Sequence, residues 1–376
     1  MTRFTVERLL EPFSFSQFCD AYFEKQPLLI RRQLPAHYGD LLTFDALNAH
    51  LGQAAMLSTE LRLVRNGEYL AESDFSWPDS SDNTRVADNA ADKETLFARF
   101  YEGYSIVVSA YERHCASVLH LCHDMERVFH ALAMTYVFLT PRNAQGFRAH
   151  RDEEDTFILQ FAGTKHWTVS DGSGKPIIST TLEPGDFLYL PGGFVHEARS
   201  ADTVSGHITL ILERFTYADL LRQIADNAHA SAWLRKSLPA DVRSGKSNAA
   251  FLRHVHQFFD EADLPAYVER MHSDFAEDRL PDSTNRLADY VKLPTIGAAS
   301  RFRRRSGFWP ELKNGGEQVV LTFHRKELAF PVAAAQSLRV MIDGGEFVAS
   351  ALPGDGDENL ALCSTLVREG FLTIVE

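Results

Sequence analysis

The spacing of hydrophobic residues changes three times along the chain. In the first 135 residues, apolar positions at helical spacing alternate with short apolar runs. These patterns predict helices over residues 13–24, 44–51, 96–103 and 115–133, and strands over residues 27–30 and 105–109. Residues 73–93 are rich in Asp, Ser and Asn, and we interpret them as a long polar loop.

From Tyr136 the pattern becomes that of β-structure. The segments TYVFLTP, DTFILQFAG, KHWTVSD, DFLYLP and GHITLILERF are strand-like runs separated by Gly, Pro and Asp turns. This density of short strands predicts an all-β sandwich or barrel.

After residue 215 helical periodicity returns, over residues 217–229, 248–259 and 264–275. A smaller mixed unit starts near Ile296, with the strands QVVLTF, EFVAS and FLTIV and helices near residues 332–340 and 360–369. We predict a strand-rich domain over residues 1–215, a helical segment over residues 216–295, and a winged-helix-like domain over residues 296–376.

The composition is that of an ordinary globular protein, and the charge balance is acidic. The chain has 38 basic and 51 acidic residues and a net charge of −13. Nucleic-acid phosphates repel such a charge, so we expect no direct nucleic-acid binding. A cationic peptide or protein would suit it as a partner.

Targeting signals and cysteine usage favour a cytoplasmic protein. Residues 1–10 lack a signal-peptide apolar stretch, and no apolar window is long enough to span a membrane. The four cysteines form no CxxC pair, and we expect reduced thiols. The pairs His114-Cys115 and Cys122-His123 do not have the spacing of a common zinc module.

The candidate chemistry lies in the strand-rich block. His150 and Asp152 are two residues apart, and on a strand such residues point to the same face. His196 supplies a second imidazole from a later strand. Two histidines and one carboxylate form the facial triad of non-haem Fe(II) oxygenases, which leaves metal positions open for a cosubstrate and O₂.

The surrounding sequence makes this triad more specific than an HxD pair alone. Residues 185–196, GDFLYLPGGFVH, fit the cupin motif G-x5-P-x-G-x2-H, although Ser200 stands where that motif has Asn. Lys165 begins another strand of the block. A buried lysine there could bind the distal carboxylate of 2-oxoglutarate through a charge-assisted contact.

Residues 138–167, FLTPRNAQGFRAHRDEEDTFILQFAGTKHW, resemble the JmjC-type ribosomal oxygenases, a cupin subgroup of 2-oxoglutarate oxygenases. The segments KQPLLIR at residues 25–31 and GYSIV at residues 103–107 are similar to the family as well. The resemblance implies an α+β fold. Its core would be a double-stranded β-helix (jelly-roll, cupin or JmjC), followed by a helical dimerisation segment and a C-terminal winged-helix-like domain.

The resemblance also implies an activity, a site and partners. His150, Asp152 and His196 match the Fe(II) ligands, Lys165 the residue that binds 2-oxoglutarate, and Thr209 a polar position close to this cosubstrate. The enzyme would use O₂ to hydroxylate a His or Arg side chain of a ribosomal protein. It would act as a homodimer.

Four residues depart from the family pattern. Tyr136 and Phe138 stand where the family often has Asn and Tyr, so a tyrosine hydroxyl near the cosubstrate is lost. Arg148 and Arg151 flank His150, and two cations there are unexpected for an enzyme with a cationic substrate.

Several alternatives therefore stay open. The same chemistry could act on a peptide natural product or a free amino acid. The barrel could instead hold zinc or manganese as an isomerase or hydrolase, or the chain could be a dimeric scaffold. Histone demethylation is a further option, although no chromatin-reading module is visible in the sequence.

Overall fold

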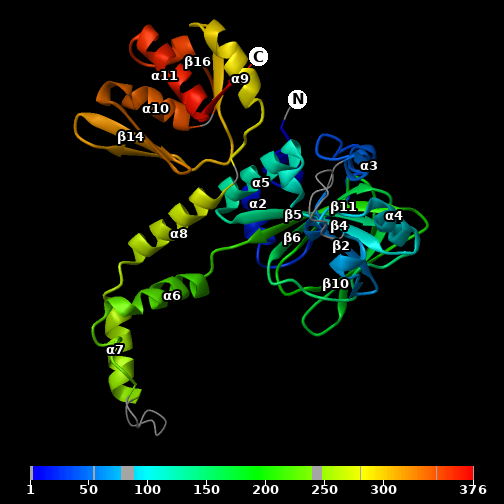
Figure 1. Cartoon of the computed structure of the whole chain (residues 1–376). Helices are drawn as coiled ribbons and strands as arrows, with labels where there is room; N and C mark the ends of the chain where they lie inside the picture. The colour runs from blue at the N-terminus through cyan, green and yellow to red at the C-terminus, as the bar shows by residue number, and fades with distance from the viewer. Residues whose placement is uncertain are drawn as a thin grey trace. The chain divides into compact units, whose positions relative to one another are not determined.

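The computed structural model describes residues 3–53, 56–77, 89–238, 248–279, 281–343 and 345–375. The chain divides into two compact units, Met1–Arg214 and Phe215–Glu376, which we describe separately (Figure 1). Most of the predicted polar loop over residues 73–93 lies outside the described residues. Among the residues that are described, no helix combines the length and the apolar character that crossing a membrane requires.

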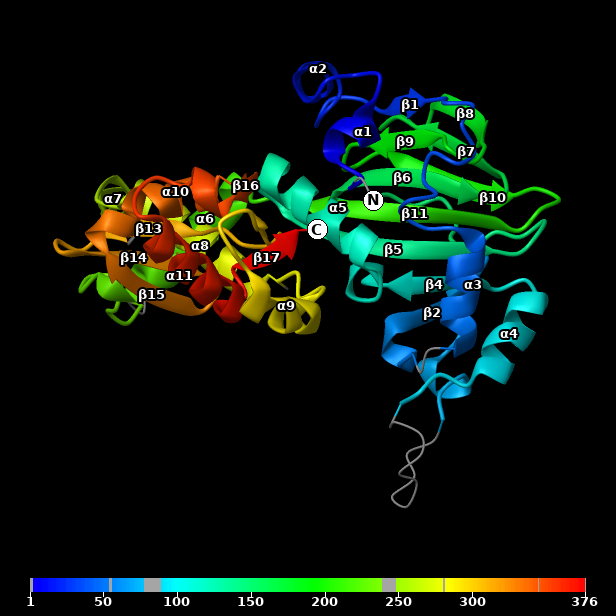
Figure 2. The ribbon, with the colours of Figure 1, turned by 90° about the horizontal axis from the view of Figure 1, so that it is seen from above.

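The first unit is built on two antiparallel sheets. In spatial order, the larger sheet contains β1 (Leu28–Ile30), β9 (Phe187–Leu190), β6 (Asp155–Ala162), β11 (Ser205–Glu213), β5 (Leu132–Thr140), β4 (Ser105–Ser109), β2 (Leu61–Arg65) and β3 (Glu68–Tyr69) (Figure 2). The smaller sheet contains β10 (Val195–Ser200), β7 (Lys165–Ser170) and β8 (Pro176–Leu182). This arrangement confirms the predicted double-stranded β-helix core.

Alternation along the strands sorts side chains to the two faces of the large sheet. On β11, Ile208 and Leu210 belong to the main hydrophobic core on the outer face. His207 and Thr209 occupy the alternate positions and therefore face the inside of the barrel. A separate apolar cluster, which includes Ile158 of β6 and Trp167 of β7, fills the space between the two sheets.

Helices cover the outer face of the large sheet. Phe18 and Phe129, from two different helices, contact Phe157 of β6 at ring distances of 6.0 and 5.8 Å. Burying such aromatic surface is the main stabilising term for the packing of helices on a sheet. The helices of this unit are α1 (Val6–Leu10), α2 (Phe15–Ala21), α3 (Phe44–Gln53), α4 (Lys93–Tyr101) and α5 (Ala116–Phe129).

The last helix of this unit ends earlier than the sequence pattern predicted. The helix expected over residues 115–133 ends at Phe129, because His130 adopts a left-handed conformation as its C-cap. Residues from Leu132 onward then begin β5. The apolar residues keep a helical spacing beyond His130, so the sequence pattern did not show the change from helix to strand.

The second unit begins with helices and ends in a mixed α/β part. Phe215 and Trp309 both contact Phe275 of α8, at ring distances of 5.5 and 5.0 Å, so α8 joins the two parts. The helices of this unit are α6 (Tyr217–Asp226), α7 (Asn248–Asp260), α8 (Leu264–Asp278), α9 (Arg286–Lys292), α10 (Ala335–Ile342) and α11 (Gly356–Glu369).

The terminal part has more strands than the sequence pattern predicted. Two three-stranded sheets occur, in the orders β16-β12-β17 and β13-β14-β15. The strands are β12 (Arg301–Arg304), β13 (Glu311–Asn314), β14 (Gln318–Phe323), β15 (Lys326–Pro331), β16 (Glu346–Val348) and β17 (Leu372–Val375).

The basic run at residues 301–305 covers β12 and the residue after it. Arg301 and Arg303 form ion pairs with Glu346, and Arg305 forms an ion pair with buried Asp289. Assignment of this part as a winged-helix-like domain remains a prediction.

Candidate metal centre in the barrel

His150 and His196 are brought together by their own backbones. The amide of His150 donates to the carbonyl of His196 over 3.1 Å, and the amide of His196 donates back over 2.8 Å. His196 lies on β10, whereas residues 150–152 lie in the irregular segment before β6. The prediction that His150 and Asp152 share a regular strand is therefore wrong; one antiparallel bridge and a loop bring them together instead.

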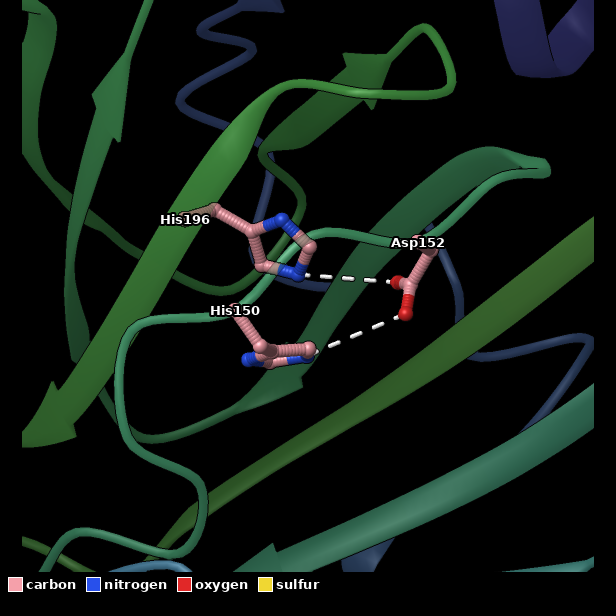
Figure 3. Close-up of side chains that lie close together, drawn as sticks. All are labelled: His150, Asp152 and His196. Carbon is pink, nitrogen blue, oxygen red and sulfur yellow. Dashed lines mark ion pairs between the residues drawn. The ribbon is translucent and has the colours of Figure 1, made fainter. Parts of the chain in front are cut away.

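The three side chains nevertheless converge on one point (Figure 3). His150 Nε2 lies 3.9 Å from Asp152 Oδ1, and His196 Nε2 lies 3.6 Å from Asp152 Oδ2. One donor atom from each residue lies within 4.8 Å of the others. His196 is 6% exposed, whereas His150 and Asp152 are 39% and 31% exposed, so this cluster has one buried and one accessible side.

Both imidazoles are held in the orientation that a metal requires. His150 Nδ1 lies 2.8 Å from the carbonyl of Arg148, and His196 Nδ1 lies 3.1 Å from the carbonyl of Phe194. A carbonyl can only accept, so each Nδ1 carries the proton and each Nε2 presents a lone pair. Burial, together with neighbouring His150, lowers the pKa of His196, which favours the neutral form that binds metals.

A tight turn fixes the backbone of the carboxylate ligand. The amide of Gly193 donates to the carbonyl of Asp152 over 2.7 Å. At Gly192, an added Cβ would lie 2.1 Å from the carbonyl oxygen of Glu153. The PGG sequence of the cupin motif thus permits a close approach of two backbones, which holds Asp152 against β10.

A β-hairpin fixes the loop that carries His150. The turn between β2 and β3, at Asn66 and Gly67, donates backbone hydrogen bonds to the carbonyls of Gln145 and Gly146 over 2.8 and 2.6 Å. Arg148 lies across the same turn and donates to the carbonyl of Asn66 over 2.5 Å. Gly67 has φ of +80°, and a Cβ there would lie 2.9 Å from Arg148 Cγ.

This arrangement explains one of the two arginines that were unexpected beside the metal site. Arg148 packs on the hairpin and lies 3.5 Å from Glu68, so its charge is partly balanced away from the triad. Its carbonyl also orients His150. Arg151 is exposed.

Lys165 lies in the barrel interior, as its proposed role requires. Its side chain is 4% exposed, and its ammonium donates to Thr140 Oγ1 over 3.0 Å. Burial lowers the pKa of Lys165 to about 7. Among the described residues, no carboxylate offsets this burial, so the ammonium is available to an anionic ligand.

The other positions singled out from the sequence lie on the same inner face. Thr209 is 7% exposed and pairs with Tyr136 and Ile158 on the flanking strands. Phe138 pairs with His207, and their rings stack with centroids 4.6 Å apart. Sequence reasoning missed His207, although it occupies an inward position on the same alternating strand as Thr209.

A zinc site built from the Cys-His pairs is not supported by the described residues. Within them, His150, Asp152 and His196 form the one group with metal-binding geometry. Two imidazoles and a carboxylate that approach from one side fit iron(II) with open positions, and a closed structural zinc site would need a fourth protein ligand.

Comparisons with known proteins agree with this fold. A family model described as "JmjC domain" matches residues 112–220. A protein from Aedes aegypti named "Bifunctional lysine-specific demethylase and histidyl-hydroxylase NO66" is 27% identical over 317 residues, which cover 73% of this chain and 48% of that protein. The protein of the same name from Culex quinquefasciatus is also 27% identical, over 86% of this chain and 54% of its own length. The chain thus spans about half the length of these relatives.

Solved structures share the fold over nearly the whole chain. A structure of YcfD, a ribosomal oxygenase from Escherichia coli, covers 97% of this chain and 99% of its own, with a TM-score of 0.56 and 16% identity. A second YcfD structure, in complex with cobalt and 2-oxoglutarate, has a TM-score of 0.51 with the same coverage and identity. From the family model and the barrel geometry, we conclude that residues 112–220 form a JmjC domain, and that the chain has the fold of the YcfD structures.

Proposed function

We propose that this protein is an Fe(II)- and 2-oxoglutarate-dependent oxygenase that hydroxylates a side chain of a protein or peptide, of the histidine or arginine type. The observation that carries the proposal is the combination of an accessible His150–Asp152–His196 cluster with a buried Lys165 in the same barrel, whose burial no carboxylate of the described residues offsets. Fe(II), 2-oxoglutarate and O₂ would together supply the oxidising chemistry that inserts oxygen into a C–H bond.

The side chains of the barrel have distinct parts in this proposal. His150, Asp152 and His196 would hold the metal, with Asp152 supplying the negative charge. Lys165 would bind the distal carboxylate of 2-oxoglutarate. Thr209 lies on the same inner face of the barrel and would make a further polar contact with this cosubstrate. The apolar cluster around Trp167 and Ile158 excludes water from this end of the barrel.

A row of aromatic rings supports entry of the substrate beside the hairpin. Phe147 lies 5.5 Å from the ring of His150 and 5.7 Å from that of Tyr69, which is 57% exposed. Such a surface suits the apolar or planar part of a peptide side chain. The named relatives include histidyl-hydroxylases and ribosomal oxygenases, which supports a protein substrate. A peptide natural product or a free amino acid remains the alternative.

The proposal is tested by 2-oxoglutarate turnover. The chain would be purified without oxygen, loaded with Fe(II), and supplied with 2-oxoglutarate and air in the presence of candidate peptides. We expect succinate to form, and we expect its rate to rise with a peptide that is hydroxylated. If 2-oxoglutarate does not bind the metal-loaded protein, the oxygenase proposal is wrong and a different metal-cupin activity takes its place.

We also propose that the protein is a cytoplasmic homodimer. On α6, Tyr217 and Leu221 lie one turn apart and are 89% and 53% exposed, and Phe251 of α7 is 48% exposed. Exposed apolar surface of this kind marks interaction sites. Light scattering should give twice the chain mass, and Leu221→Asp should shift the protein toward monomer. A wild-type monomer at micromolar concentration would contradict the dimer.

A further inference from the structure

A second basic side chain, His207, is buried in the barrel beside Lys165. It is 1% exposed, stacks on Phe138 with centroids 4.6 Å apart, and meets Trp167 edge-on at 5.5 Å. Lys165 Nζ lies 5.8 Å from the Phe138 centroid and 5.9 Å from the Trp167 centroid. The ammonium and the imidazole therefore border the same two aromatic rings.

Two polar atoms that border this enclosure lack a partner among the described residues. Within the described part of the chain, His207 Nδ1 is buried without a hydrogen-bond partner, and so is Trp167 Nε1. A buried polar atom without a partner destabilises a fold, and native interiors contain few of them. Two such atoms beside a buried ammonium indicate a place that a ligand with acceptor oxygens completes.

The charges of the enclosure also favour an anion. Burial, and the neighbouring charge of Lys165, lower the pKa of His207 well below its usual value. The imidazole is therefore neutral at physiological pH and has one N–H to donate. The described residues provide no carboxylate that offsets the burial of Lys165.

The enclosure adjoins the candidate metal centre. The ring of Trp167 lies 6.1 Å from that of His196 and 5.5 Å from that of His207. Trp167 therefore borders both the His150–Asp152–His196 cluster and the enclosure that contains Lys165 and His207.

We propose that His207 is a second anchor of the cosubstrate, with its Nδ1–H donating to the same distal carboxylate that Lys165 binds. This inference rests on the proposed use of 2-oxoglutarate. In this role, His207 contacts the cosubstrate directly and fixes the direction from which the carboxylate enters. The competing explanation is that His207 only packs against Phe138.

Calorimetric titration of the Mn(II)-loaded full chain with two ligands separates these explanations. 2-Oxoglutarate has the distal carboxylate, whereas oxalate chelates the metal but lacks that arm. In His207→Phe, which keeps the stacking on Phe138, we expect the affinity for 2-oxoglutarate to fall about 10- to 100-fold, as for the loss of a hydrogen bond to a charged group. The affinity for oxalate should not change. His207→Gln, which keeps an N–H, should lose less.

The matched control is His166→Phe, because His166 is the exposed neighbour of Lys165 on β7 and should leave both affinities unchanged. Nitrogen NMR of the Zn(II)-loaded wild-type chain gives a readout that needs no stable variant: the Nδ1 resonance of His207 should shift with 2-oxoglutarate and not with oxalate. An unchanged 2-oxoglutarate affinity in His207→Phe, or a parallel loss of oxalate affinity, would overturn the role of His207. Failure of the wild-type chain to bind 2-oxoglutarate would instead refute the proposed function itself.

Discussion

His150→Ala is expected to abolish succinate formation and to weaken metal binding by more than about 100-fold. Residues that only orient a metal ligand typically contribute about 10- to 100-fold to metal affinity, so the loss of a ligand should exceed that range. The fold should survive, because the imidazole is 39% exposed and the backbone bridge to His196 does not involve the side chain. Co(II) titration and the succinate assay measure the two effects.

The control for this experiment is His166→Ala, which removes an exposed imidazole from the same barrel. It should bind Co(II) as the wild type does. Removal of the metal from the wild type by a chelator should reproduce the loss of activity in His150→Ala, and Fe(II) should restore activity only to the wild type. Wild-type turnover in His150→Ala would show that this residue is not a ligand.

Lys165→Met is expected to weaken 2-oxoglutarate binding by about 2–5 kcal/mol, the usual cost of removing one partner of a buried, hydrogen-bonded charge pair. The affinity of the wild type should also depend on pH. Because the pKa of Lys165 in the free protein is about 7, the ammonium that the carboxylate needs is fully present only at lower pH. The dissociation constant should therefore rise by up to about tenfold per pH unit above pH 7, and in Lys165→Met this dependence should disappear.

The same substitution should stabilise the ligand-free fold. The pKa of Lys165 falls from 10.5 to about 7 on folding, so the unfolded chain binds a proton more readily between these values. The destabilisation by the buried ammonium is complete below pH 7 and declines as the pH rises toward 10.5. Lys165→Met should thus raise the free energy of unfolding by about 2–4 kcal/mol near pH 7 and by less at pH 9.

Chemical denaturation at the two pH values, without metal or cosubstrate, checks this difference. Thr164→Val, at the half-buried position before Lys165, serves as the control and should not change the pH dependence. If Lys165→Met destabilises the chain at both pH values, the lysine has a structural role that its hydrogen bond to Thr140 does not explain.

Local patterns in the sequence were sufficient for the β-barrel and for singling out the three residues that the structure brings together as a candidate metal site. Strand alternation in GHITLILERF divides its residues between two faces, because side chains on a strand point alternately to opposite sides. The cupin motif in GDFLYLPGGFVH singled out His196, and in the structure this histidine lies beside Asp152. Lys165 at the start of a strand was expected in the barrel, and it is buried there.

Other features depended on contacts between residues far apart in the sequence. His150 and Asp152 do not share a strand; their convergence depends on the bridge to His196 and on the Asn66–Gly67 hairpin. The position of Arg148 in the sequence suggested a positive charge at the opening of the candidate metal site, but its side chain packs on that hairpin. His207 is distinguished by its stacking on Phe138 and by an Nδ1 that has no hydrogen-bond partner among the described residues, and only packing reveals these features. The sequence by itself therefore determined which residues could do the chemistry, because residue type and strand period are local properties. Orientation, burial and charge balance came from the tertiary structure, because they depend on which distant segments pack together.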